Sequence, residues 1–101
     1  MRYFVIESTF HQPASVSEQE LRRLVKEHQA CFARGFAEGW ILASGPKVAS
    51  GGGAIVLNMS SIEEVEAYLA GDPLKVAGVQ DYRVVEFRLH DCQPEVREWF
   101  R

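Results

Sequence analysis

The sequence lacks long apolar runs, a basic leader and any cluster of basic residues. No apolar stretch exceeds about four residues, whereas a membrane-spanning helix needs about 20. Residues 1–7 are typical of a strand and carry no basic region or cleavage site, so no signal peptide is predicted. Lys and Arg are scattered and the net charge is −3, so we expect neither nucleic acid nor a membrane as a partner.

Cysteine is also scarce, with only Cys31 and Cys92 in the chain. Without an export signal, we expect both as reduced thiols in a cytoplasmic protein. The pairs His28–Cys31 and His90–Cys92 offer two ligands each, too few for a structural metal site, so no metal is predicted. The motifs G-x-G-x-x-G and G-x-S-x-G are absent, and glycines 51–53 lack the Lys and Ser/Thr of a phosphate loop. No cofactor is therefore expected.

What the sequence does contain is a set of local signals for alternating strands and helices. Ser-x-x-Glu capping boxes open two amphipathic segments, one running from Ser17 to Gly39 and one from Ser61 to Gly71. Residues 72–78 begin with Asp-Pro, which predicts a short helical turn. Apolar and alternating segments predict strands over residues 3–6, 40–43, 54–59 and 82–89, the middle two joined as a hairpin by residues 47–53.

The resulting order of elements is β, α, β, β, α, β in a chain of 101 residues, which is one domain. Right-handed crossovers turn this order into a ferredoxin-like α+β fold, an antiparallel sheet with both helices on one face. Strands 3–6 and 54–59 are apolar on both sides, so a second copy of the chain is expected to cover the other face as a homodimer. We assign residues 1–90 to this domain and residues 91–101 to a tail, helical in its spacing, that packs on the body or on the partner subunit.

One polar ring interrupts the apolar stripe of the first helix. His28 shares a helical face with Leu21, Leu24, Val25 and Phe32. A histidine in that place is either a packed core residue bonded to the backbone or the lining of a cavity, where it can move protons near neutral pH. Asp72 has two interpretations as well. It is either a helix cap or an acid that lines a cleft with His28 and fixes the tautomer of its ring.

Two stretches carry a family resemblance. Residues 39–46, Gly-Trp-Ile-Leu-Ala-Ser-Gly-Pro, resemble the G-x-L-x-x-x-G-P pattern of YciI-like proteins, the YCII-related domain family, with Ile41 in place of Leu. Residues 71–79 resemble the D-P-[FY]-x-x-A-G-[VL] pattern of the same proteins, with Leu74 in place of the aromatic residue. His28 falls where the family carries a helix histidine. The similarity extends from Arg2 to about Leu89.

The resemblance implies a dimeric α+β barrel, related to the muconolactone isomerase type, with His28 and Asp72 as the catalytic pair. Two functions are then open. One is a cofactor-free lyase or isomerase that transfers a proton on a small cyclic or aromatic molecule, with Ser44 binding a substrate oxygen and Tyr3 and Trp40 forming an apolar wall. The other is a non-catalytic protein that binds a small molecule or a partner in the same place.

Overall fold

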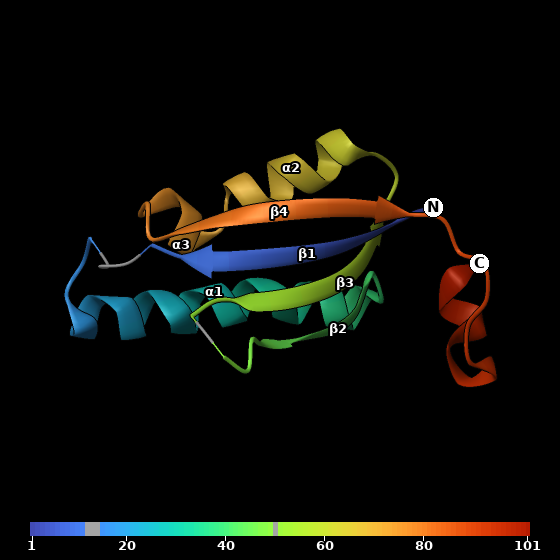
Figure 1. Cartoon of the computed structure of the whole chain (residues 1–101), viewed down its shortest axis with the longest axis horizontal. Helices are drawn as coiled ribbons and strands as arrows, with labels where there is room; N and C mark the ends of the chain where they lie inside the picture. Colours follow the sequence, from blue (N-terminus) through green and yellow to red (C-terminus); the bar gives the residue numbers. More distant parts are fainter. Residues whose placement is uncertain (12–14, 50) are drawn as a thin grey trace.

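The computed structural model describes residues 1–11, 15–49 and 51–101, which form one antiparallel sheet and its covering helices (Figure 1). The strands are β1 (Arg2–Phe10), β2 (Ile41–Pro46), β3 (Gly53–Met59) and β4 (Gln80–Phe87), in the spatial order β2-β3-β1-β4. The helices are α1 (Glu18–Glu38), α2 (Ile62–Ala70) and the short α3 (Pro73–Val76). This arrangement is the predicted ferredoxin-like βαββαβ fold.

The helices begin and end at the predicted capping residues. The hydroxyl of Ser17 accepts a hydrogen bond from the backbone N–H of Glu20, and the hydroxyl of Ser61 accepts one from Glu64. Gly39 ends α1 with a φ of 85°, the left-handed conformation that favours glycine. These local contacts satisfy backbone groups that the helix ends leave unpaired, so helix length here is set by the sequence itself.

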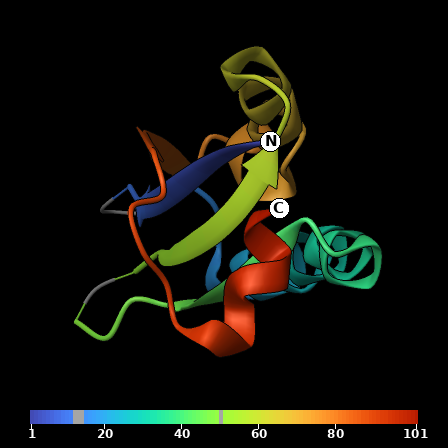
Figure 2. The same ribbon diagram turned by 90° about the vertical axis from the view of Figure 1, so that its right-hand side faces the viewer.

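One face of the sheet carries the core. Seen along the strands, α1 and α2 lie on the same side of the sheet (Figure 2). The fully buried side chains of β1, Phe4 and Ile6, point to that side and meet Leu57 of β3 and Val65 of α2. On the opposite face, Val5 and Val85 are 40% and 43% exposed, and no helix of the described residues covers them. The sheet therefore has one covered and one open face.

The strand ends differ from the predicted ones. β1 continues to Phe10 and β2 continues to Pro46, each beyond its apolar run. The reason is that the backbone pairing of β1 with β4, and of β2 with β3, extends past those runs. β4 begins at Gln80 and ends at Phe87, two residues earlier at each end than predicted. The loop predicted over residues 47–53 connects the β2–β3 hairpin, although residue 50 lies outside the described part of the chain.

The C-terminal tail forms a 3₁₀ helix, Pro94–Phe100, that lies beside the end of the sheet (red in Figure 1). The hydroxyl of Tyr3 donates to the carbonyl of Phe100 at 2.6 Å, and the indole N–H of Trp99 donates to the carbonyl of Gly39 at 2.8 Å. The rings of Trp99 and Phe100 pack on Tyr3, which lies on the open face. None of the described helices has both the length and the apolar character needed to cross a bilayer.

Candidate functional site

A cavity of about 370 Å³ lies between α1, the ends of β1 and β4, and the β2–β3 hairpin. This volume falls within the range of small-molecule sites, which are concave and mostly apolar with a few polar groups. Its apolar lining comes from β1, α1, α3 and the β2–β3 hairpin: Phe10, Val25, Phe32, Leu74, Pro46, Ala54 and Ile55. Its polar lining includes Ser8, His28, Gln29, Ser44 and Gln80. The cavity can therefore hold a small, largely apolar molecule.

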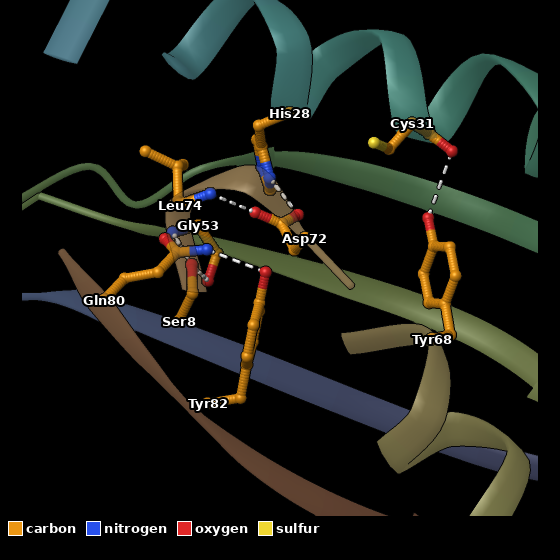
Figure 3. A network of polar contacts seen from close by, with 9 residues as sticks. All are labelled: Ser8, His28, Cys31, Gly53, Tyr68, Asp72, Leu74, Gln80 and Tyr82. Atoms are coloured by element: carbon orange, nitrogen blue, oxygen red, sulfur yellow. Dashed lines mark hydrogen bonds and ion pairs between the residues drawn. The ribbon is translucent and has the colours of Figure 1, made fainter. Parts of the chain in front are cut away.

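His28 connects this cavity to a buried acid. Its side chain is 16% exposed, lines the cavity, and packs edge-on against Phe32 one turn later, with ring centroids 4.5 Å apart. Its Nδ1 is hydrogen bonded to Oδ2 of Asp72 (Figure 3). Because an ionised carboxylate only accepts, Nδ1 carries the proton and Nε2 is left as the acceptor of the neutral ring. His28 thus lines the cavity, and its ring is bonded to a side chain and not to the backbone.

Asp72 is both a helix cap and the partner of His28. Its Oδ1 accepts the backbone N–H of Leu74 at 2.9 Å at the start of α3, while Oδ2 faces His28. Burial by itself raises the pKa of Asp72, but the hydrogen bond and charge of His28, the Leu74 N–H and the Tyr82 hydroxyl outweigh it. The pKa therefore lies below its ordinary value of 3.8, and the carboxylate is ionised near neutral pH.

Two residues of β4 complete this polar network, and sequence reasoning missed both. The hydroxyl of Tyr82 faces Asp72 and accepts a hydrogen bond from Nε2 of Gln80 at 2.7 Å. Burial, with the charge of Asp72 next in importance, raises the pKa of Tyr82 well above its ordinary value, so its hydroxyl keeps its proton. Gln80 is only 1% exposed. Gln80 lies two residues before the strand predicted over residues 82–89, and no pattern in the sequence marked it.

The other predicted site residues are divided between the cavity and the rest of the surface. Ser44 lines the cavity and is exposed at its edge. Tyr3 lies on the open face of the sheet against the tail, and Trp40 packs perpendicular to Tyr68 with ring centroids 4.9 Å apart. Neither residue contributes to the lining of the His28 cavity. The structure thus brings together His28, Asp72 and Ser44 and separates them from Tyr3 and Trp40.

Cys31, one turn after His28, is the nearest thiol to the pair. Burial first, and then the charges of Asp72 and Glu27, raise the pKa of this thiol above its ordinary value. The thiolate that would attack a substrate or bind a metal is therefore disfavoured. Within residues 1–11, 15–49 and 51–101, no three His, Cys, Asp or Glu side chains converge as metal ligands.

The described residues thus form a ferredoxin-like α+β domain with a His–Asp pair beside a cavity. The profile of the YCII-related domain matches residues 1–88, and the chain belongs to that family. No curated protein sequence matches the chain with significance.

Two solved structures share the fold at low sequence identity. The first is 5-chloro-2-hydroxyhydroquinone dehydrochlorinase from Burkholderia phenoliruptrix AC1100, in complex with 2,5-dihydroxybenzoquinone. It is 20% identical with a TM-score of 0.72, over 85% of this chain and 93% of that one. The second is muconolactone isomerase, 17% identical with a TM-score of 0.75, over 91% of this chain and 94% of that one. Both likenesses concern the fold.

Proposed function

We propose that this chain is a cofactor-independent lyase or isomerase that transfers a proton on a small cyclic or aromatic molecule. The observation that carries the proposal is the position of His28, whose ring is bonded to a buried carboxylate on one side and lines a mostly apolar cavity on the other. The two relatives of the same fold are named for reactions on a chlorinated hydroxyhydroquinone and on muconolactone. Both names describe small cyclic compounds that suit a cavity of this size.

In the proposed reaction, Nε2 of His28 takes a proton from the bound molecule and later returns one. Asp72 holds the proton on Nδ1 and stabilises the imidazolium that forms, because its carboxylate is ionised. Ser44 binds a substrate oxygen at the edge of the cavity. Leu74, in place of an aromatic residue, gives the wall beside Asp72 an aliphatic surface. Positioned proton transfer of this kind contributes about 10²–10⁴-fold to a rate.

The test is proton exchange and conversion with 5-chloro-2-hydroxyhydroquinone and muconolactone in D₂O, followed by NMR. We expect the wild-type protein to exchange or convert at least one of them, and His28→Ala to lose about 10²–10⁴-fold of that rate. His90→Ala is the matched control, since His90 is exposed and outside the cavity lining. Activity that survives His28→Ala contradicts the proposal. Binding without exchange or conversion would assign the chain a ligand-binding role instead.

We also propose that the protein works as a homodimer in the cytoplasm. The open face of the sheet supports the dimer: Val5 lies between Val56 and Val85 on neighbouring strands, so their apolar side chains form a continuous row. A symmetric partner would remove this row from water. Cys31 and Cys92 are free thiols, which fits a reducing compartment.

A further inference from the structure

One buried polar atom in the lining of the cavity has no partner. Gln80 is 1% exposed and belongs to the cavity lining, together with His28 and Leu74. Its amide nitrogen donates to the Tyr82 hydroxyl at 2.7 Å, whereas its Oε1 is the one buried side-chain atom of the described residues without a hydrogen bond. Buried amide oxygens are almost always paired, so this atom needs an explanation.

The neighbours of Gln80 fix which end of its amide is free. A tyrosine hydroxyl has a single proton, and that of Tyr82 faces the ionised carboxylate of Asp72, which can only accept. The hydroxyl must therefore accept its second hydrogen bond, and the only amide group of Gln80 that can donate it is Nε2. The contact of Nε2 with the Tyr82 hydroxyl thus leaves Oε1 as the unused acceptor (Figure 3).

Other polar groups in the lining do not share this property. Ser8 is also buried, but its hydroxyl accepts the backbone N–H of Gly53 at 2.8 Å and donates to the Gly53 carbonyl at 3.4 Å. Its hydrogen-bonding capacity is thus used within the fold. Gln80 differs because its second group has no protein partner among the described residues.

We infer that Gln80 is a specificity-determining residue whose Oε1 accepts a hydrogen bond from a hydroxyl group of the molecule in the cavity. The inference rests on the proposed function, because it concerns the same cavity, and it narrows the substrate class. The apolar walls formed by Phe10, Val25 and Phe32 suit a flat ring, and the acceptor selects a ring with a hydroxyl donor. An ether or ketone at that position leaves the amide oxygen unpaired and binds more weakly.

The test compares hydroquinone with 1,4-dimethoxybenzene, which has the same ring and no donor. Calorimetric titration of the wild-type protein should give tighter binding of hydroquinone. Gln80→Met, which keeps the side-chain length and removes the acceptor, should weaken hydroquinone binding about tenfold, the effect of one lost hydrogen bond. Binding of dimethoxybenzene should stay within about twofold. Gln93→Met is the matched control, since Gln93 is exposed in the tail.

A second measurement does not depend on the variant. In ¹⁵N-labelled wild-type protein, the side-chain amide signals of Gln80 should shift with hydroquinone and stay in place with dimethoxybenzene. The inference is overturned if wild-type protein binds neither compound or both equally, or if Gln80→Met weakens both alike. Failure of the proposed function looks different: hydroquinone is still preferred through Gln80, while no cyclic compound is converted or exchanged.

Discussion

At the scale of the residue, Asp72 combines two roles that the sequence presents as alternatives. A carboxylate has two oxygens, and here Oδ1 caps α3 while Oδ2 binds His28. The cap gives the acid a fixed position on the backbone, so the ring opposite it is held in one tautomer. The Pro73 that follows fixes the start of α3 and contributes to the same rigidity. A capping residue can therefore be part of a site without losing its structural role.

The lowered pKa of Asp72 predicts how stability depends on pH. Folding favours the ionised carboxylate, so the stabilisation is complete above the ordinary value of 3.8 and is lost as the pH falls through the lower folded value. Asp72→Asn keeps a capping side chain and removes the charge. We expect it to lower the free energy of unfolding by about 1–3 kcal/mol at pH 7. In urea titrations the difference from wild type should shrink below pH 4; a constant difference would contradict this explanation.

At the scale of the element, Gly35 determines how closely α1 approaches the start of β2. A Cβ on this buried residue would clash with Cδ1 and Cγ1 of Ile41 and come within 3.0 Å of Cη2 of Trp40. From the sequence, Gly35 reads only as a weak point of the helix, costing about 1 kcal/mol relative to Ala. The structure explains why a glycine stands here: without a Cβ, residue 35 leaves space for the side chain of Ile41 at the start of β2.

Gly35→Ala should therefore destabilise the protein although alanine favours helix. Overpacking costs about 1–3 kcal/mol and exceeds the gain in helix propensity. The measurement is the free energy of unfolding in urea for Gly35→Ala, Ile41→Val and the double variant. Since Ile41→Val removes the Cδ1 atom in the clash, the alanine should cost less in that background. Equal costs in both backgrounds would mean that the contact with Ile41 does not set the effect.

The helices, the strands and the inward position of His28 could be predicted because their signals are local. The capping boxes, the helical stripe and the Asp-Pro step each lie within one short segment of the sequence. The stripe places His28 on the inward face of its helix. The residues that form the apolar wall of the cavity could not be predicted. Residues 3–6 are all apolar, so alternation does not say which of them point inward, and the structure turns Phe4 inward and Tyr3 outward. Gln80 belongs to no pattern, since its meaning depends on Tyr82 and on a cavity made by distant segments.

At the scale of the whole molecule, the two faces of the sheet differ in what covers them. The covered face carries the core and the cavity. The open face presents the valines of three neighbouring strands at its centre and the aromatic tail at one end. An exposed row of apolar side chains on a sheet favours association, and the proposed symmetric contact would cover it with no further element.

Val85→Glu tests the proposed interface, because Val85 lies on the open face beside Val5 and is not part of the cavity lining. In a symmetric interface the substitution buries two like charges, so we expect the dimer to dissociate. Light scattering at micromolar concentration should give twice 11.4 kDa for wild type and 11.4 kDa for the variant. Val76→Glu is the control, since Val76 is 73% exposed on α3. A wild-type protein that is monomeric, or a variant that stays dimeric, would show that the open face is not the dimer interface. We expect dissociation to leave the binding of hydroquinone in each chain unchanged.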